Sequence, residues 1–319
     1  MNKIKLDALA NIIGAEVFGN KNIEISGISN SPPFNNKLVF IENLKKTPKE
    51  INQYAAILTS PNHKDSLKDY NLLLAPNPKL AFAKITSLFK TSLPYESFDK
   101  VKPNLIFGNR VKLGENLKFG KNVIIEDDVS IGNNVILGHN VVIGSNSSIG
   151  DDVKIESGTV IGSEGFGNVQ NNEHSWDHIH HLGGVVINSG VSIGANCTIA
   201  RGTLNNTVIN KGVIIDNLVH IAHNTTIGEN TAIAAKTGIA GSCNIGARNL
   251  IGGMVGIIDH ITTADDVTIS ATSTVNKNID LPGVYTGIMP ISKHSSWKRI
   301  AFWITKIDKI AKFLNLKKI

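Results

Sequence analysis

The stretch from Ile209 to Ile257 reads INKGVIIDNLVHIAHNTTIGENTAIAAKTGIAGSCNIGARNLIGGMVGI, with an isoleucine at every sixth residue. This period is neither the two residues of a half-buried strand nor the 3.6 residues of a helix, so it excludes a simple β-sandwich and a helical bundle. A period of six is typical of a parallel β-helix, in which each hexad forms one short strand and one turn. One hexad cannot bury its aliphatic residue alone, so the stacking of successive coils must supply the stability.

The same period governs most of the chain from residue 107 onward. It breaks at a loop insertion, Ser163–Gly184, and again at a short insertion around the sequence RGTLNN. After Ile257 it passes through Thr263 and returns twice more. The periodic positions outside the opening stretch are Phe107, Leu113, Phe119, Ile125, Ile131, Leu137, Ile143, Ile149, Ile155, Ile161, Ile187, Ile193, Ile199, Ile269 and Val275. The sequence therefore predicts a mainly β protein built on a parallel β-helix of hexapeptide repeats.

Residues 1–100 carry no such repeat and mix helical with strand patterns. Helices are predicted at residues 6–14, by their apolar spacing, and at Pro78–Lys90, which begins with proline after Asn77. Short apolar runs predict strands at Ile23–Ile28, Leu38–Ile41, Ala55–Ser60 and Leu72–Ala75. The pattern indicates a small α/β domain that ends in the proline-containing stretch Leu93–Pro103. We therefore predict domains at residues 1–100, 101–290 and 291–319.

The last stretch, Trp297–Ile319, has the pattern of one amphipathic helix. Its apolar residues alternate spacings of four and three, as in a coiled-coil seam, so the helix is expected to cap the solenoid or to pair with copies of itself. The seam consists of Ile300, Ile304, Ile307, Ala311 and Leu314. The net charge of +6 also lies here, because this stretch has seven basic residues and one acid. That surplus could attract an acidic partner or an anionic membrane surface, or simply form a solvated helix face.

The composition narrows the class of protein further. Aromatic residues make up 6% of the chain and there are 29 glycines, a mix that fits a β-rich fold with many tight turns. Two cysteines, Cys197 and Cys243, indicate a reducing compartment rather than a disulfide framework. No apolar run approaches the roughly 18 residues that cross a bilayer, so no integral membrane segment is expected. The N-terminus carries Asp7 and Asn11 within its apolar part and makes a poor signal peptide, which favours the cytoplasm.

Five stretches carry a resemblance to a known family. They are IGSEGFG (Ile161–Gly167), TIARGTLNNTVI (Thr198–Ile209), GVIIDNLVHIAHN (Gly212–Asn224), TAIAAKTGIAGS (Thr231–Ser242) and PGVYTGIMP (Pro282–Pro290). The chain resembles the left-handed β-helix acyltransferases, and among them the UDP-3-O-acylglucosamine N-acyltransferases of lipid A biosynthesis. The order of the stretches, the loop insertion and the C-terminal helix also match, so the resemblance covers nearly the whole chain.

The resemblance implies a left-handed parallel β-helix with three hexads per coil and a homotrimer with active sites in the grooves between subunits. It implies transfer of a 3-hydroxyacyl group from acyl carrier protein to the 2-amino group of a UDP-glucosamine derivative that already carries an O-linked acyl chain. The acyl group would travel on a phosphopantetheine arm. No metal, no free nucleotide cofactor and no nucleic-acid partner are implied.

The resemblance places the catalytic base at His223. Acylation of an amine requires a group that accepts the amine proton, and a histidine side chain is suited to this near neutral pH. Three hexads per coil put Gly241, eighteen residues later, one coil above His223. Its backbone N–H is therefore a candidate oxyanion donor, as in the family, although a plain turn glycine is the alternative. Asn224, next to His223 in the matching stretch, is assigned to substrate binding.

Other polar residues around His223 have less certain roles. His260 lies two coils and one residue further, roughly 10 Å along the same groove, and is assigned to the phosphopantetheine arm or the acyl donor. Asp216 matches the family by motif, but within one subunit it falls on an adjacent face. It is either a carboxylate that orients His223, reached across a trimer interface, or a structural turn residue. The role of His220 is left open.

Phe40 and Asn43 match the family's uridine-binding stretch in the N-terminal domain. Phe40 would stack on uracil and Asn43 would form a hydrogen bond to it, although Phe40 could equally be a core residue. The family has an aromatic residue where this chain has Lys46, so one stacking contact is in doubt. Lys46 is kept among the predicted substrate-binding residues.

The chain departs from the family pattern at two further places. Acids are usual where this chain has Ala200, Asn205 and Asn206, so charged contacts near that loop are expected to be missing. Bulky methionine is frequent at the acyl-length gauge, where this chain has Thr274 and Asn276. The smaller residues predict tolerance of a longer hydroxyacyl donor.

Four histidines of the loop insertion, His174, His178, His180 and His181, could be read as metal ligands. Metal sites need ligands held in a fixed geometry with supporting contacts, and the nearest acids along this run are Glu173 and Asp177. We therefore predict no metal site, and expect the loop to serve the substrate or a trimer interface.

Several other functions fit the repeat pattern alone. The nearest alternative is another sugar O- or N-acyltransferase that uses an acyl carrier protein or acetyl-CoA, because a fold does not fix a function. A zinc hydratase with interfacial histidines and a scaffold without catalysis are the others. The N-terminal domain and the basic C-terminal stretch favour an acidic carrier protein as the donor.

Overall fold

Each hexad turn bends at a residue with a left-handed backbone. Asn116, Asn122, Asp128, Asn134 and Asn140 recur every six residues with φ between 56 and 59°. Asparagine and aspartate tolerate this conformation better than most residues, because their short polar side chains form local hydrogen bonds. In the computed structural model, which describes residues 3–89, 96–97 and 105–314, these turns alternate with strands of mostly two residues. The chain divides into two units, Met1–Leu93 and Pro94–Ile319.

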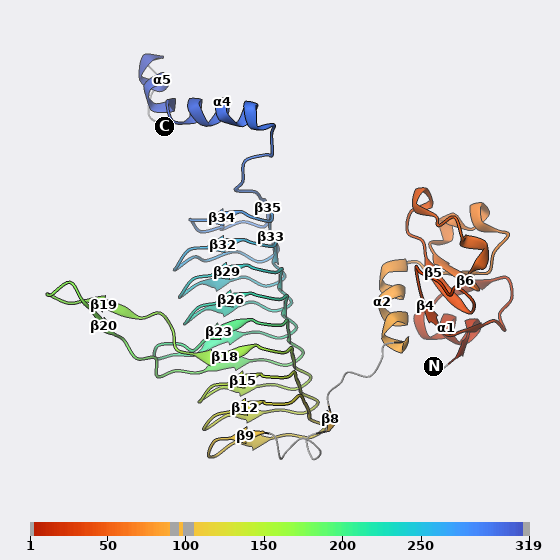
Figure 1. Cartoon of the computed structure of the whole chain (residues 1–319), viewed down its shortest axis with the longest axis horizontal. Helices are drawn as coiled ribbons and strands as arrows, with labels where there is room; N and C mark the ends of the chain where they lie inside the picture. The colour runs from red at the N-terminus through yellow and green to blue at the C-terminus, as the bar shows by residue number, and fades with distance from the viewer. Residues whose placement is uncertain (1–2, 90–95, 98–104, 315–319) are drawn as a thin grey trace. The chain divides into compact units, whose positions relative to one another are not determined.

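The strands of the second unit form three sheets, in which neighbours lie one coil apart (Figure 1). One sheet contains β9 (Ile106–Phe107), β12 (Ile124–Ile125), β15 (Val142–Ile143), β18 (Val160–Ser163), β23 (Thr198–Ala200), β26 (His220–Ile221), β29 (Gly238–Ile239), β32 (Gly256–Ile257) and β34 (Thr274–Val275). The second contains β8 (Glu96–Ser97), β11 (Lys118–Phe119), β14 (Ile136–Leu137), β17 (Lys154–Ile155), β22 (Ser192–Ile193), β25 (Ile214–Ile215), β28 (Ala232–Ile233), β31 (Leu250–Ile251), β33 (Val267–Ile269) and β35 (Gly283–Tyr285).

The third sheet contains β10 (Lys112–Leu113), β13 (Ser130–Ile131), β16 (Ser148–Ile149), β21 (Val185–Ile187), β24 (Thr207–Ile209), β27 (Thr226–Ile227) and β30 (Asn244–Ile245). All pairs in the three sheets are parallel except β8 with β11. Ile221 pairs with Ile239 and Ile239 with Ile257, so a full coil takes eighteen residues. The predicted fold class, a parallel β-helix of hexapeptide repeats, is confirmed.

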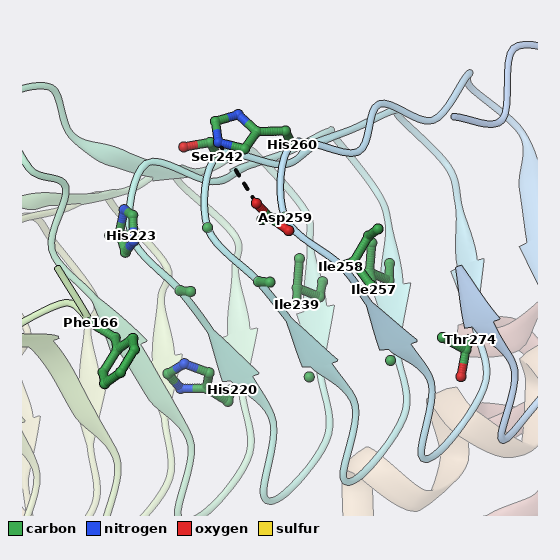
Figure 2. A pocket seen from close by; sticks show the side chains of 15 residues that line it. Phe166, His220, His223, Ile239, Ser242, Ile257, Ile258, Asp259, His260 and Thr274 are labelled. Atoms are coloured by element: carbon green, nitrogen blue, oxygen red, sulfur yellow. Dashed lines mark ion pairs between the residues drawn. The ribbon is translucent and has the colours of Figure 1, made fainter. Parts of the chain in front are cut away.

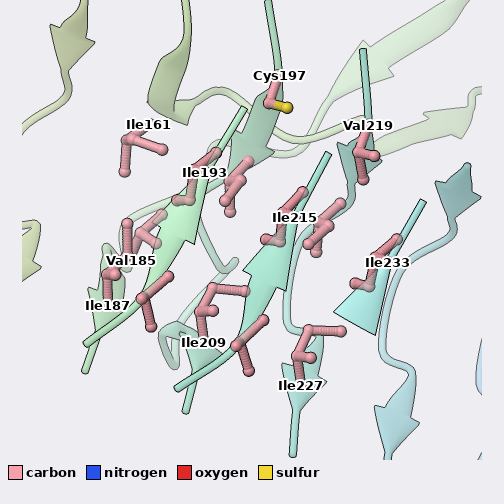
Figure 3. Close-up of a cluster of buried hydrophobic side chains, with 14 of the residues drawn as sticks. Ile161, Val185, Ile187, Ile193, Cys197, Ile209, Ile215, Val219, Ile227 and Ile233 are labelled. Carbon is pink, nitrogen blue, oxygen red and sulfur yellow. The ribbon is translucent and has the colours of Figure 1, made fainter. Parts of the chain in front are cut away.

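The periodic aliphatic residues fill the interior of the coils. Side chains from successive coils, such as Ile161, Ile193 and Ile215, point into one continuous core (Figure 3). Most are almost completely shielded from solvent. Full burial of such a side chain contributes about 1.5–3 kcal/mol, so the stack of hexads is a source of stability and a rigid support for its turns.

The loop insertion forms an antiparallel hairpin of β19 (Asn168–Gln170) and β20 (Trp176–His178), which projects from the stack of coils (Figure 1). The chain leaves after β18 and returns at β21, on the next sheet of the same coil, so the hexad order is kept. The short second insertion makes β23 pair with β26 across 22 residues, as in Ile199 with Ile221.

The solenoid continues beyond its last periodic position, Val275. β35 pairs in parallel with β33 and adds another strand to its sheet. Thr263, where the aliphatic period is interrupted, is buried and forms an isolated bridge with Ile279.

The N-terminal unit is a small α/β domain, as predicted. Its five-stranded sheet has the order β2–β7–β6–β5–β4, parallel except for the pair β2–β7. The elements are β1 (Ile4–Lys5), α1 (Leu6–Ile13), β2 (Glu16–Phe18), β3 (Glu24–Ile25), β4 (Gly27–Ile28), β5 (Lys37–Phe40), β6 (Ala56–Thr59), β7 (Leu72–Leu74), α2 (Pro78–Phe89) and four 3₁₀ turns, η1 (Leu44–Lys46), η2 (Ile51–Gln53), η3 (Pro61–His63) and η4 (Asp65–Leu67). Most of the expected boundary Leu93–Pro103 lies outside the described residues.

The C-terminal stretch differs from the single helix that was predicted. It forms α4 (His294–Ile304) and α5 (Ile307–Phe313), separated at Thr305 and Lys306. The Thr305 hydroxyl donates a hydrogen bond of 2.7 Å to the Phe302 carbonyl at this break. In the described part of the chain, no helix is long and apolar enough to cross a membrane.

Candidate active site

His223 lies in the turn after β26, beside a groove of about 730 Å³ on the sheet of β26, β29 and β32. Figure 2 shows His223, Ser242 and His260 along the turns at one edge of this groove, and Thr274 at the end far from His223. The groove thus runs along the solenoid axis, and each coil along it contributes residues to its lining.

A column of four residues, two of them glycines, forms the floor of this groove. His220, Gly238, Gly256 and Thr274 are in register on four successive strands. A Cβ atom added at Gly238 or Gly256 would have no atom of the described residues within 4 Å, and neither glycine has a positive φ. Neither the backbone nor the packing within the chain therefore requires glycine here. The two glycines instead leave an open track along the groove floor between His220 and Thr274. Each coil adds about 4.8 Å to the length of this track.

The imidazole of His223 is oriented by Asn224. The Oδ1 atom of Asn224 accepts hydrogen bonds from the Thr203 backbone N–H at 3.1 Å and the Thr203 hydroxyl at 2.9 Å. A backbone N–H can only donate, so this contact fixes the amide oxygen in place. The same oxygen lies 2.9 Å from Nδ1 of His223, and Nδ1 must therefore carry a proton. In the neutral ring the lone pair is then on Nε2.

Gly241 lies against the ring of His223, one coil above it. A Cβ atom at Gly241 would be 2.8 Å from both Cε1 and Nε2 of His223, so only glycine fits beside this ring. At the matching position of other coils, the turn N–H is bound by a side chain eighteen residues later, as Asn133 N–H is by Asp151 at 2.6 Å and Ala247 N–H by Asp265 at 2.8 Å. Among the described residues Gly241 N–H has no such acceptor, so it remains an available donor beside Nε2.

His181, which was not assigned to the site from the sequence, is the nearest aromatic neighbour of His223. The two ring centroids are 4.9 Å apart at an angle of 67°. The His181 side chain is 0% exposed, and its Nδ1 lies 3.0 Å from the Ile179 carbonyl, to which it donates. Burial, and then the nearby His223, lower the pKa of His181, which favours its neutral form. His181 lies near the end of the loop insertion, where the period of six is interrupted, so the sequence could not place it beside His223.

Glu164 connects His181 to the rest of the inserted loop. Its Oε1 accepts a hydrogen bond of 2.7 Å from the His181 backbone N–H, the main reason why the pKa of Glu164 lies below its ordinary value. His178 Nε2 is 3.4 Å from the same oxygen. The sequence had pointed to Glu173 and Asp177 as the acids near these histidines, whereas the fold brings Glu164 to them from 14 residues away, at the other side of the hairpin.

His260 and Thr274 also line the groove, and their roles stay predictions. The His260 backbone N–H donates to the Gly241 carbonyl at 3.0 Å, and its ring, 75% exposed, lies 4.0 Å from Asp259. Thr274 ends the glycine column, whereas Asn276 lines a separate cavity together with Tyr285. Phe166, which projects into solvent beside His223, is a lining residue that was not singled out from the sequence.

Asp216 lies in the turn after β25, on a different sheet. Its Oδ1 accepts from the Asn217 backbone N–H at 2.8 Å, and its Oδ2 accepts from the Ala235 backbone N–H at 3.2 Å. The structure does not bring it to His223 within one chain, and the amide of Asn224 holds the place that was considered for a carboxylate.

Three residues stand where the family usually has acids: Ala200, Asn205 and Asn206. Ala200 is buried, and Asn206 accepts a hydrogen bond of 2.8 Å from the Gly184 backbone N–H. Asn205 is exposed.

A second groove of about 640 Å³ lies on the N-terminal unit, with Phe40, Asn43 and Lys46 in its lining. Phe40 is half-buried and stacks on Phe82 with ring centroids 4.8 Å apart, so it is both a core residue and a groove residue. Asn43 Oδ1 accepts from the Lys45 backbone N–H at 2.9 Å, which leaves its amide NH₂ to donate. His63 also lines the groove and was missed; its Nδ1 lies 2.8 Å from the Thr59 hydroxyl.

Comparisons with known proteins agree with this architecture. A family model described as bacterial transferase hexapeptide (six repeats) matches residues 110–145, 128–163 and 206–241. A protein named UDP-3-O-acylglucosamine N-acyltransferase from Vesicomyosocius okutanii is 45% identical, with 98% of this chain and 97% of that protein covered. A protein of the same name from Albidiferax ferrireducens is 40% identical, with 93% of this chain and 91% of that protein covered.

Two solved structures share the fold. UDP-N-acetylglucosamine acyltransferase from Campylobacter jejuni has a TM-score of 0.51 at 23% identity, covering 58% of this chain and 70% of that one. The Francisella novicida enzyme of that name has a TM-score of 0.51 at 22% identity, covering 68% and 80%. These likenesses support the β-helix, and the much closer relatives supply the family. The chain belongs to the UDP-3-O-acylglucosamine N-acyltransferase family and is an acyltransferase.

Proposed function

We propose that the protein transfers a 3-hydroxyacyl chain from acyl carrier protein to the 2-amino group of a UDP-3-O-acyl-glucosamine, a step in lipid A biosynthesis. The names of the relatives and the earlier resemblance supply the substrates. The observation that carries the chemistry is the fixed tautomer of His223, whose Nε2 lone pair lies at the groove because Nδ1 keeps its proton and donates a hydrogen bond to Asn224.

The reaction uses His223 as the base. As the amine nitrogen attacks the thioester carbonyl, Nε2 accepts its proton, and the carbonyl oxygen becomes an oxyanion. The Gly241 N–H, which has no acceptor among the described residues, is the donor that would stabilise this charge. When the C–S bond breaks, the imidazolium returns the proton to the leaving thiolate. The balance is one amide formed, one thioester broken and one proton moved from nitrogen to sulfur.

The groove would hold the donor. We assign its far end, with His260 and the track of Gly238 and Gly256, to the phosphopantetheine arm and the acyl chain. A homotrimer would close this groove with the neighbouring subunit, and in that assembly Asp216 could still reach a partner's His223. No metal or free cofactor takes part in the proposed transfer.

The groove of the N-terminal unit would bind the uridine. Phe40, which is half-buried and lines this groove, would stack on the base, and the free NH₂ of Asn43 can donate to a uracil carbonyl. Lys46 replaces the family's aromatic residue and would contact a phosphate by charge rather than the base by stacking. His63, held through Nδ1 by Thr59, presents Nε2 as a further polar group to the base.

The decisive experiment is a mass-spectrometric acylation assay with a panel of donors and acceptors. We expect N-acylation with 3-hydroxyacyl carrier protein and UDP-3-O-acyl-glucosamine, and a loss of about 10²–10⁴ in kcat for His223→Ala. Transfer to a hydroxyl group, or from acetyl-CoA alone, would instead support another sugar acyltransferase. Undiminished transfer by His223→Ala would contradict the assigned base.

Thr274 at the end of the track leads to an expectation about the length of the donor. A side chain larger than threonine would shorten the open track, so Thr274→Met should shift preference toward shorter hydroxyacyl chains in a competition between donors. The unaltered protein should accept longer donors. A preference of the unaltered protein for short donors would contradict this assignment.

A further inference from the structure

Three side chains at the base of the hairpin come together outside the acyl-transfer groove. Glu164 precedes β19, His178 ends β20 and His180 follows it, and one ligand atom of each lies within 4.8 Å of the others. His178 and His180 are two residues apart, so they share a face of the extended chain, and their ring centroids are 4.9 Å apart. Two imidazoles and one carboxylate are a common ligand set for zinc and related metals.

One of the ligand-to-ligand distances is already that of a metal site. Ligand atoms of a tetrahedral zinc, at about 2.0–2.1 Å from the ion, lie about 3.3 Å from one another. His178 Nε2 and Glu164 Oε1 are already 3.4 Å apart. The three side chains are exposed, so a small rotation can bring in the remaining ligand without opposition from a packed core.

Two hydrogen bonds orient His178 and Glu164. The Nδ1 atom of His178 lies 3.2 Å from Oδ1 of Asn168 on the paired strand, which leaves Nε2 to face Glu164. Glu164 is itself fixed by the His181 backbone N–H, at 2.7 Å. Supporting hydrogen bonds of this kind set the orientation of ligating histidines and carboxylates in known metal sites.

The strands of the hairpin expose large apolar side chains to solvent. A two-stranded ribbon alone is marginal in water, and Val169 and Trp176 on its strands are 53% and 68% exposed. A link between β20 and Glu164 would tie the hairpin to the body of the solenoid. Because Glu164 also holds His181, and His181 packs on His223, the link would reach the wall of the active site.

We propose that Glu164, His178 and His180 bind one divalent transition-metal ion, zinc by preference, which anchors the inserted hairpin beside the active site. The ion takes no part in acyl transfer. Its remaining coordination position is open to water or to a group from a neighbouring molecule.

The test is a titration of full-length, tag-free protein that has been stripped with a chelator. We expect about one Zn²⁺ per chain in competition with a chromophoric chelator, and a visible absorption band when Co²⁺ is used instead. His178→Asn, His180→Asn and Glu164→Gln should each weaken Zn²⁺ binding by about tenfold or more. Glu164→Gln keeps an acceptor for the His181 N–H and so leaves that contact in place.

His174→Asn is the matched control. His174 lies in the turn of the same hairpin with a φ of 60°, which asparagine also tolerates, and it is not one of the three ligands. It should bind Zn²⁺ as the unaltered protein does. Hydrogen exchange should show slower exchange of residues 168–178 when Zn²⁺ is added to the unaltered protein and to His174→Asn, but not to His178→Asn.

Equal Zn²⁺ affinity in the unaltered protein, His178→Asn and His180→Asn would overturn the proposal, as would a fall of the same size in His174→Asn. In that case His178 and Glu164 form only an exposed ion pair. Thermal unfolding of each variant identifies any that fail to fold. The binding assay involves no turnover, and His223→Ala should lose transfer and keep the metal, so this proposal and the proposed function fail separately.

Discussion

Asn224 provides the orienting contact that a carboxylate was expected to supply to His223. An amide oxygen fixes the ring without adding a charge beside it, so the base keeps one tautomer and no ion pair forms. The oxygen can do so because Thr203 donates to it twice. The Asn224 side chain thus positions the His223 ring, while its assignment to substrate binding stays a prediction.

Removal of the amide should therefore affect the chemical step more than binding. We expect Asn224→Ala to lower kcat by about 10-fold or more, with little change in KM, because His223 can then rotate or change tautomer. Asn224→Asp keeps an acceptor and should restore part of the rate. Steady-state kinetics of the two variants would check this. A rise in KM at constant kcat would point to direct substrate binding instead.

His181 should make the stability of the protein depend on pH. Its pKa is lowered in the folded protein, so as the pH falls below the ordinary histidine value, near 6.5, the unfolded chain binds a proton that the folded chain resists. This stabilising contribution is full above that pH and is lost as the pH falls toward the folded-state pKa. The groups that face the ring are His223, Glu164 and His178.

We accordingly expect the unfolding temperature of the unaltered protein to fall more between pH 7.5 and 5.5, values chosen to span the ordinary histidine pKa of about 6.5, than that of His181→Gln. Differential scanning calorimetry at both pH values would measure this. His294→Gln, at an exposed histidine, is the control and should behave as the unaltered protein. An identical pH dependence in His181→Gln would contradict the assignment.

Spacing predicts neighbours where the chain is periodic and fails where it is not. Gly241 could be placed against His223 by counting eighteen residues, and the structure puts its Cα there. His181 and Glu164 could not, because an insertion has no period and its closure depends on tertiary contacts. The break at Thr305 and Lys306 was also missed, because the apolar spacing of four and three runs through it without a slip.

Among the elements, β29 and β32 stand out because their outward residues are glycines. Strands disfavour glycine, yet none of the residues that the structure describes occupies the space where a side chain would lie. Glycine lowers the strand propensity of β29 and β32, but it keeps the groove floor open. This contrast between fold and function could be read from the sequence only after the register of the coils was known.

Valine at these positions should separate folding from activity. Valine is favoured in strands and meets no atom at Gly256, so Gly256→Val should unfold at the same temperature or slightly higher. Transfer from long-chain donors should fall by at least about tenfold, since a misplaced donor loses the advantage of proximity. Thr226→Val, at an outward position of another sheet, is the control. Full activity with long donors in Gly256→Val would place the acyl chain elsewhere.

The whole chain joins a regular solenoid to a mixed α/β unit, and the two differ in how far their structures could be predicted. The solenoid follows from one period, and its insertions are visible as slips in that period. In the N-terminal unit the predicted helices and the other predicted strands are present, but the strand predicted at Ile23–Ile28 is divided into β3, which pairs with β1, and β4, which pairs with β5. The short strands β1 and β2 were missed, because two or three residues show no clear alternation of apolar and polar side chains. His63 and Phe40 line the same groove because each follows or ends one of two paired parallel strands, β6 and β5. The local sequence pattern does not reveal this pairing.

Charge is the other property that belongs to the whole molecule. The surplus of +6 falls in the C-terminal stretch, of which Lys317 and Lys318 lie outside the described residues. If an acidic carrier protein binds there, replacing Lys298, Arg299, Lys306 and Lys309 by glutamine should weaken its binding by about 0.2–1 kcal/mol per lost pair and flatten the salt dependence. Binding measurements across a salt titration would test this. Unchanged affinity and slope would count against a docking role.

Because each coil takes eighteen residues, the length of the active-site groove can change without a change in the residues around His223. Duplicating one whole coil between Gly241 and His260 would lengthen the track by about 4.8 Å and keep every residue on its own sheet. Adding a single hexad there would instead turn His260 and Thr274 onto the next face of the prism, away from His223. The same rule explains how a long hairpin can be inserted after β18 at no cost to the register. A solenoid of this kind can change its reach in steps of one coil and its attachments at any turn, while the base, its asparagine and the glycine above it remain as they are.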